Sequence, residues 1–351
     1  MDKMGKLALF VLAASGAIAL ASEVLWTRAL EILIGNSTYA FAMIVVVYLL
    51  GIAAGSWAMS LIVNRLKSLS LWLAGLQLGM GIWTIIAIIL FSFVGQTLSK
   101  DANTPHLISE IFWYHLQAVF LLFPIAFLSG ANFPLATRMI APRSEDANGV
   151  LIARAYAWNT IGAVFGSLIA GFGIAAFLDY FQAIYLLGVF YGLTALIVVF
   201  VSIGKNFQKQ YAMVVMGIIS CAVIGFTVIQ TTEKNRFTEH LKPYHGGFEV
   251  VYHKPGLQGV TTVLQHPGNP YHARLLVNAA GMTVKVTDTK MMAHLPMLLH
   301  PNPENTLVIC FGMGTTYRSA VSHGNRVTVV ELVKEVFDTF DYFYTDAQYV
   351  R

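Results

Sequence analysis

Long apolar stretches follow one another through the first two thirds of the chain, and they constrain the fold more than any other feature. Seven of them reach about 20 residues, the length that a helix needs to cross a bilayer. They lie near residues 7–34, 38–62, 70–95, 112–140, 150–177, 181–203 and 211–230. Only 11% of the residues are charged and 56% are hydrophobic, more apolar surface than one water-soluble core can bury. We therefore expect residues 1–230 to form a transmembrane helical bundle in a lipid bilayer.

Basic residues gather in alternate loops of this expected bundle. Pairs of them stand before the first stretch and after the second, fourth and sixth: Lys3 and Lys6, Arg65 and Lys67, Arg138 and Arg143, and Lys205 and Lys209. The positive-inside rule then places the N-terminus in the cytoplasm, and seven spans put everything after residue 230 on the outer face. The alternative is that one stretch does not cross. The first is the weakest of the seven because it contains Glu23 and Arg28.

A charged cluster of Glu23, Arg28 and Glu31 lies in or near this first stretch. Charges at bilayer depth are costly, and they usually pair inside a bundle or mark a pathway. Arg28 and Glu31 are three positions apart and so share one helical face. The charges therefore lie at the outer end of a span formed by residues 7–22, form a structural ion pair, or belong to a transport site.

Glycines recur four residues apart in three of the apolar stretches: Gly51 and Gly55, Gly75 and Gly79, and Gly162 and Gly166. Small residues at this spacing let helix backbones approach closely in a membrane. We expect these glycines to serve close helix packing.

The composition changes after the last apolar stretch. Residues 231–246 are polar and are expected to form a linker. Residues 247–287 contain the segments FEVVYHKPG, GVTTVLQHP and HARLLVNAAGMTVKV, which alternate or are rich in β-branched residues, with the turn PGNP at 267–270. This pattern predicts a small antiparallel β-sheet.

Residues 288–351 alternate between helix and strand patterns. Asp288 is expected to cap a first helix. The expected elements are a helix over 289–300, a strand over 306–312, a helix over 315–323, a strand over 326–332 and a helix over 334–344. The order predicts an α/β domain that begins an incomplete Rossmann-like, doubly wound sheet.

A glycine-containing turn follows the first of these parallel strands. At Gly312 and Gly314, glycine lets backbone N–H groups approach a ligand. Glu331 ends the next strand, where an acidic side chain can accept hydrogen bonds from ribose hydroxyls. Tyr317 stands at the third glycine position of the dinucleotide pattern, which favours a single nucleoside such as S-adenosylmethionine. The turn is either an adenosyl site or a packing turn.

Several segments are similar to known families. LQGVTTVL, ARLLVN, MMAHLPMLLHPNPENTLVICFGMGTT and VVEL resemble the spermidine synthase family of aminopropyltransferases. SEVLWTRAL, FLSGANFPLATR and YAWNTIGAVFGSLIAGF resemble the major-facilitator-like membrane segment that precedes such a domain in bacterial membrane proteins. The resemblance is most specific at residues 288–316, and it implies an integral protein of the bacterial inner membrane.

The resemblance also implies ligand-binding residues. Gln258 matches a glutamine that touches the adenosyl ligand, and Glu331 matches the acidic ribose ligand. Gly312 and Gly314 match the family's glycine-rich loop, with Met313 where the family has aspartate. The implied ligand is decarboxylated S-adenosylmethionine or a related adenosyl compound.

Two departures concern the polyamine and the catalysis. The family's Tyr-His-Glu, which helps to form the ligand and polyamine pocket, aligns with Asp288, Thr289 and Lys290. Asp288 is therefore the residue implied to bind a polyamine substrate. The family's catalytic aspartate lies on strands that would begin after Arg351, so no catalytic residue is assigned. We expect the domain to be truncated at its C-terminal end or completed by a second chain.

Other classes of site find little support. The basic residues are scattered, which argues against nucleic acid. The ten histidines lack a metal-binding spacing, so no metal is expected, and Cys221 and Cys310 are expected to be buried and unpaired. The sequence thus predicts a membrane-bound, spermidine synthase-like protein that binds an adenosyl ligand for aminopropyl transfer. The alternative is a transporter-like membrane protein with a non-catalytic soluble appendage.

Overall fold

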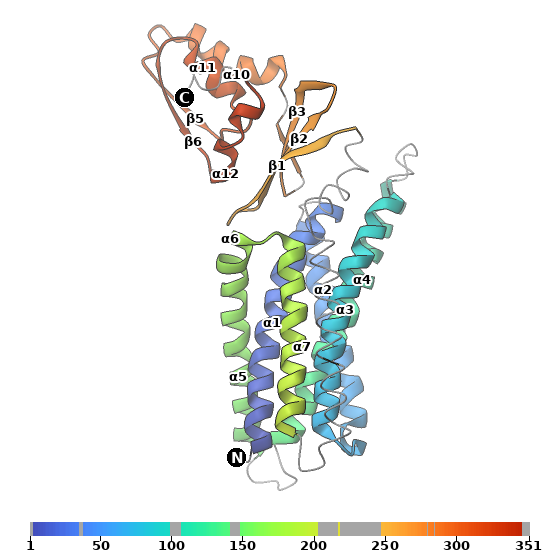
Figure 1. Ribbon diagram of the computed structural model, residues 1–351. Coiled ribbons are helices and arrows are strands. Elements are labelled where there is room, and N and C mark those ends of the chain that lie inside the picture. The colour runs from blue at the N-terminus through green and yellow to red at the C-terminus, as the bar shows by residue number, and fades with distance from the viewer. Residues whose placement is uncertain are drawn as a thin grey trace. The chain divides into compact units, whose positions relative to one another are not determined.

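The structure is a computed structural model (Figure 1), which describes residues 3–34, 38–98, 107–140, 148–202, 217, 247–278, 280–283 and 285–345. The chain divides into two compact units. Met1–Ile174 and Tyr180–His240 form the first, here called the helical unit. Ala175–Asp179 and Leu241–Arg351 form the second, the α/β unit.

The described part of the helical unit consists of long helices. They are α1 (Lys3–Ile34), α2 (Thr38–Ile62), α3 (Leu69–Leu98), α4 (Leu107–Ile140), α5 (Asn148–Leu168) and α7 (Tyr180–Ser202). A 3-10 turn (Val63–Arg65) follows α2, and a π-helix (Ile169–Ile174) continues α5. The short α6 (Ala175–Phe177) comes next in the chain and belongs to the α/β unit. Figure 1 shows the long helices side by side.

Six described helical stretches are long and apolar enough to cross a membrane, against the seven predicted. The helices coincide with the first six predicted stretches to within a few residues, so the helical character of this region is confirmed. The seventh stretch, 211–230, lies outside the described residues except for Gly217. Its crossing stays a prediction.

Glycines bring two pairs of helices into backbone contact. A Cβ added at Gly162 of α5 would lie 1.9 Å from the carbonyl oxygen of Ala13 on α1, and one at Gly55 of α2 would lie 1.8 Å from that of Phe127 on α4. No side chain fits at such a distance. Close packing is confirmed at these glycines. At Gly75 no described residue lies within 4 Å of an added Cβ, so close packing there stays a prediction.

Buried polar side chains join four helices at the centre of the bundle. The Asn132 amide donates to Ser15 Oγ (2.8 Å) and accepts from the Gln77 amide (3.2 Å). Thr194 Oγ1 donates to Gln77 Oε1 (3.1 Å). Because buried polar groups must find partners, this network orients α1, α3, α4 and α7 about one polar layer.

The α/β unit begins with an antiparallel sheet of β1 (Glu249–Pro255), β2 (Val260–His266), β3 (Asn269–Val277) and β4 (Ala280–Thr283), paired in that order. The predicted small sheet is thereby confirmed. Val263 and Leu275 on its inner face pack with Phe311, Met313 and Phe340 in the main core of the unit. The segment after β5 is therefore fixed against the small sheet.

A parallel pair of strands completes the described fold. The elements are α10 (Thr287–Leu299), β5 (Asn305–Ile309), α11 (Thr315–Val321), β6 (Arg326–Val330), α12 (Lys334–Phe337) and a 3-10 turn (Phe340–Tyr342). β5 and β6 are parallel, as predicted, whereas the helix predicted over 334–344 is only the short α12 and that turn. Asp288 does not cap α10, since Val286 holds the N-cap position.

Among the described residues, only one face of the parallel pair is covered. Val308 packs with Ala293 of α10 and Ala320 of α11, whereas Leu307 and Ile309 on the other face of β5 are 59% and 72% exposed. A doubly wound sheet carries helices on both faces. The described residues thus form one β-α-β unit, and the Rossmann-like fold stays a prediction.

An ion pair ties β1 to the residue after α12. Lys254 Nζ lies 2.8 Å from Asp338 Oδ2, which also accepts a hydrogen bond from Tyr252 Oη (3.2 Å). The bond from Lys254 lowers the pKa of the Asp338 carboxyl group, and the same bond raises the pKa of the Lys254 ammonium group. Both side chains are about half exposed, so the pair contributes little to stability.

Replacing Asp338 with asparagine is expected to lower the thermal midpoint of the purified chain by about 2 °C or less at neutral pH. Because folding lowers the pKa of the carboxyl group, this group stabilises the fold at pH values above its pKa in the unfolded chain, and the stabilisation is lost as the pH falls through its pKa in the folded chain. Because folding raises the pKa of the lysine, that group stabilises the fold at lower pH, and the stabilisation is lost as the pH rises through the lysine pKa of the folded chain. The difference between Asp338→Asn and the parent should therefore shrink as the pH falls below the ordinary carboxyl pKa of about 4 and as it rises above the ordinary lysine pKa of about 10.4. Thermal unfolding at several pH values measures it, and a pH-independent difference would contradict the assignment.

Candidate functional site

The candidate site is the turn between β5 and α11. Its backbone has positive φ at three residues, Cys310 (71°), Gly312 (55°) and Gly314 (74°). Glycine adopts such angles without the steric penalty of a Cβ, so the two glycines permit the reversal that leads from the strand into the helix. Cys310 N–H still bonds to Val330 of β6 (2.8 Å), which keeps the start of the turn against the neighbouring strand.

Cys310 differs from the prediction that it would be buried. β5 ends at Ile309, one residue before it, and its side chain is exposed rather than buried. A non-glycine residue with positive φ is uncommon and often lies at a functional site.

Glu331, at the end of β6, is bound to the turn. Its Oε2 accepts hydrogen bonds from the N–H groups of Phe311 (2.7 Å) and Gly312 (3.4 Å). Its Oε1 accepts one from Val333 N–H (3.0 Å). The structure thus brings the predicted acidic residue and the predicted glycine turn together. Each carboxylate oxygen has two lone pairs, which leaves capacity for a ligand hydroxyl.

A cavity of about 340 Å³ opens beside this turn. Residues from β3, α10, β5, the turn, α11 and the segment after β6 line it: Leu275, Val277, Thr289, Met292, Val308, Ile309, Cys310, Phe311, Gly312, Met313, Thr315, Thr316, Glu331, Val333 and Val336. Gly312, Met313 and Glu331 among them were predicted from the sequence. The mixture of apolar walls and a few polar groups is typical of small-molecule sites.

Three predicted residues lie elsewhere. Gln258 is exposed on the β1–β2 turn, which Gly256 and Gly259 close by exchanging backbone hydrogen bonds of 2.9 and 3.2 Å. Asp288 is exposed in the first turn of α10, and Gly314 is the N-cap residue of α11. None of the three lines the cavity.

Three threonines of the wall were missed by the sequence reasoning. Thr316 Oγ1 donates to the carbonyl oxygen of Thr289 (2.9 Å), and Thr315 Oγ1 bonds to Tyr344 Oη (2.8 Å). These bonds hold α11 against α10 and against the C-terminal part of the unit. The Thr-Thr pair directly after the glycines was the available signal.

Basic side chains gather around Tyr344, next to Thr315. Lys285 Nζ donates to the carbonyl oxygen of Phe343 (2.8 Å) and lies 4.8 Å from the Tyr344 ring centroid, and Arg318 lies 4.7 Å from the same centroid. Burial lowers the pKa of Lys285, and the charges of Arg318 and Lys290 lower it further. Among the described residues there is no group of three or more His, Cys, Asp or Glu able to hold a metal ion.

The comparisons with known proteins concern only part of the chain. No family model matches it, and no solved structure matches it. Polyamine aminopropyltransferases from two strains of Leptospira biflexa serovar Patoc are each 36% identical to it over 90 residues. This segment is 25% of the chain and 26% of each relative, so the chain spans about a quarter of the length of the curated relatives it matches. The partial similarity supports a spermidine synthase-like relationship.

Proposed function

We propose that the chain is a membrane-anchored, spermidine synthase-like protein whose α/β unit binds an adenosyl ligand beside the β5–α11 turn. The observation that carries the proposal is the meeting of the Glu331 carboxylate with the N–H groups of Phe311 and Gly312 at the edge of a cavity. The partial identity to polyamine aminopropyltransferases supports the same ligand class. The ligand proposed is decarboxylated S-adenosylmethionine or a close relative.

The lining fits such a ligand in size and chemistry. About 340 Å³ lies within the range of small-molecule pockets. Glu331 would accept a hydrogen bond from one ribose hydroxyl at Oε1, and the apolar walls formed by Val308, Met292 and Val333 would hold the adenine ring. When bound, the ligand would supply a sulfonium-activated carbon for transfer to an amine.

Aminopropyl transfer needs more than this cavity provides. A carboxylate must hold the amine and accept its proton. Glu331 is the sole carboxylate among the described residues that line the cavity, and backbone N–H groups already engage both of its oxygens. We propose that transfer to a polyamine would depend on a second chain. That chain would add strands to the edge of the sheet and cover the exposed face that contains Leu307 and Ile309.

Replacing Glu331 with glutamine is expected to weaken adenosyl-ligand binding by about tenfold, because the amide keeps the shape but loses the charge and one acceptor oxygen. Isothermal titration calorimetry of the full chain in detergent, with methylthioadenosine as the ligand, measures the affinity. Glu304→Gln is the matched control, since Glu304 is exposed and does not line the cavity.

An absence of binding heat at millimolar ligand would overturn the proposal, as would an equal loss in both variants. The thermal midpoint of each variant, measured in parallel, separates a loss of binding from a loss of folding.

The side of the membrane can be tested independently. The loop charges and seven spans predict that the α/β unit lies on the outer face, whereas S-adenosylmethionine is made in the cytoplasm. Six spans would return the unit to the cytoplasmic side. The adenosyl proposal requires that side, so alkaline phosphatase fused after Arg351 should be inactive and a green fluorescent protein fusion should be bright. An active phosphatase would contradict the proposed ligand.

A further inference from the structure

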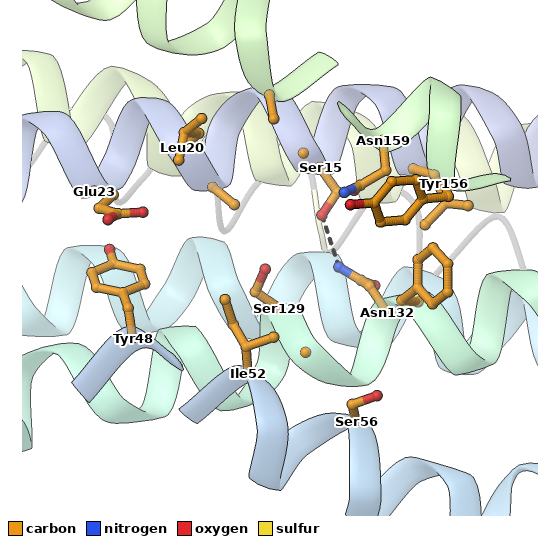
Figure 2. Close-up of a pocket in the computed structure, with 16 residues that line it drawn as sticks. Ser15, Leu20, Glu23, Tyr48, Ile52, Ser56, Ser129, Asn132, Tyr156 and Asn159 are labelled. Carbon is orange, nitrogen blue, oxygen red and sulfur yellow. Dashed lines mark hydrogen bonds between the residues drawn. The ribbon is translucent and has the colours of Figure 1, made fainter. Parts of the chain in front are cut away.

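A second cavity, of about 330 Å³, lies inside the helical unit. Residues of α1, α2, α4 and α5 line it: Leu12, Ser15, Gly16, Ala19, Leu20, Glu23, Tyr48, Ile52, Ser56, Ser129, Gly130, Asn132, Phe133, Tyr156, Asn159 and Ala163. Figure 2 shows Glu23 and Tyr48 at one end, Ser15, Asn132, Tyr156 and Asn159 at the other, and Leu20, Ile52 and Ser129 between them. The cavity therefore has two polar ends and a mostly apolar middle.

Glu23 is the one charged side chain among the described residues that line this cavity. It lies within the candidate span Lys3–Glu31. The other two charged residues of the predicted cluster, Arg28 and Glu31, lie further along α1 and do not line the cavity. An ionisable residue inside a membrane span is costly and commonly faces a functional cavity. A carboxylate without a basic residue beside it in the lining favours a cationic ligand and disfavours an anionic one.

Tyr48 provides an independent indication that the cavity takes a ligand. Its side chain is only 5% exposed, and its hydroxyl group has no hydrogen-bond partner among the described residues. Figure 2 shows this hydroxyl pointing toward the Glu23 carboxylate from the opposite wall. Leaving a buried hydroxyl group unpaired is unfavourable, and a donor placed between Glu23 and Tyr48 would satisfy both.

The opposite end is also rich in acceptors. Ser15 and Asn132 are joined to each other (2.8 Å), and Asn159 and Tyr156 of α5 lie beside them at the same end (Figure 2). Ser15 and Glu23 are eight residues apart on one helix, which corresponds to about 12 Å along its axis. A ligand that reaches both ends is therefore extended, with an apolar middle.

We propose that this cavity binds a linear, protonated alkyl amine, with one ammonium group at Glu23 and Tyr48 and a second donor group at Ser15 and Asn159. An ammonium group carries three donors, which match the carboxylate and hydroxyl oxygens. Its methylene chain matches Leu20 and Ile52, and the Tyr156 and Phe133 rings attract cations. A bare metal cation would need several more oxygen ligands at short range than this mixed lining provides. The site lies wholly in the helical unit and is independent of the adenosyl proposal.

Equilibrium dialysis of the purified full chain in detergent, with radiolabelled spermidine as the probe, tests this site. Saturable binding is expected, with displacement by 1,8-diaminooctane and not by its neutral counterpart 1,8-octanediol. Glu23→Gln should weaken binding at least about tenfold. Glu31→Gln, the same change on the same helix outside the cavity, should not alter it, and binding should persist in Glu331→Gln, which excludes the cavity at the β5–α11 turn as the site.

Tyr48→Phe provides a second test that does not alter charge. Removal of one hydroxyl group should weaken binding several-fold with little effect on folding. An absence of saturable binding at millimolar amine would overturn the proposal. Equal weakening by Glu23→Gln and Glu31→Gln, equal displacement by the diol, or full affinity in Tyr48→Phe would overturn it as well. If Glu23→Gln does not elute as a single folded species, the proposal is tested by the affinity of Tyr48→Phe and by whether 1,8-octanediol displaces spermidine from the parent chain.

Discussion

Replacing Gly162 with leucine is expected to force α5 away from α1 and to leave little folded protein. The added Cβ alone would lie 1.9 Å from the carbonyl oxygen of Ala13 and 2.7 Å from its carbonyl carbon. Those atoms belong to the backbone of a helix and cannot rotate aside, so the two helices must separate. Gly166, one turn along, has the same relation to Ala17 (2.0 Å), so the separation would break both contacts.

We expect this change to cost at least about 3 kcal/mol, a large share of the marginal stability of a protein. Fluorescence-detected gel filtration after heating measures the fraction that stays folded in detergent. Gly75→Leu on α3 is the matched control, because no described residue lies within 4 Å of a Cβ added there, and it should change stability by no more than about 0.5 kcal/mol. If both variants survive equally, α1 and α5 do not pack as closely as the structure shows.

In the helical unit, the positions of the helices could be predicted from the sequence, whereas the contacts between them could be predicted only in part. The helix positions were predicted well because the bilayer sets the length of each apolar stretch. The four-residue spacing identified Gly162 and Gly55 as contact positions but equally identified Gly75. Spacing places two residues on one helical face, and it does not say whether another helix lies against that face.

The cavity of the helical unit could not be predicted for a related reason. Ser15 and Asn132 are separated by 117 positions in the sequence, as are Gln77 and Thr194. Each is an ordinary polar residue in an apolar stretch when considered alone. Only the packing of the helices joins them and leaves Glu23 beside a cavity, so the sequence indicated a charged cluster without its surroundings.

In the α/β unit, Gly312 and Glu331, which strand order predicted, came together, whereas Gln258 and Asp288, which were matched by resemblance alone, do not line the cavity. Gly312 and Glu331 both follow parallel strands, and the carboxyl ends of such strands share one edge of the sheet. Gln258 was matched by position within a similar segment, and it is exposed and does not line the cavity. Thr289 and Thr316 were missed because their hydrogen bond depends on how α10 and α11 pack.

The conformation of Gly314 yields the prediction with the second-largest expected effect. Its φ of +74° is unfavourable for any residue with a Cβ, and a β-branched side chain is strained there. An added Cβ would also lie 2.4 Å from the Phe340 ring and 2.9 Å from the Phe311 ring. Both rings belong to the main core of the unit, where neighbouring side chains leave little room for movement.

Gly314→Val should therefore destabilise the α/β unit by about 2–5 kcal/mol, the sum of backbone strain and overpacking. Hydrogen exchange of the full chain, followed by mass spectrometry, should show at least tenfold faster exchange in β5 and α11. Gly324→Val is the control that separates the two causes, because Gly324 has nearly the same φ, +76°, and nothing within 4 Å of an added Cβ. It should show the strain alone, about 1–2 kcal/mol. Equal acceleration in both variants would mean that the turn is not packed against Phe340, and the walls of the proposed adenosyl cavity would then lose their support.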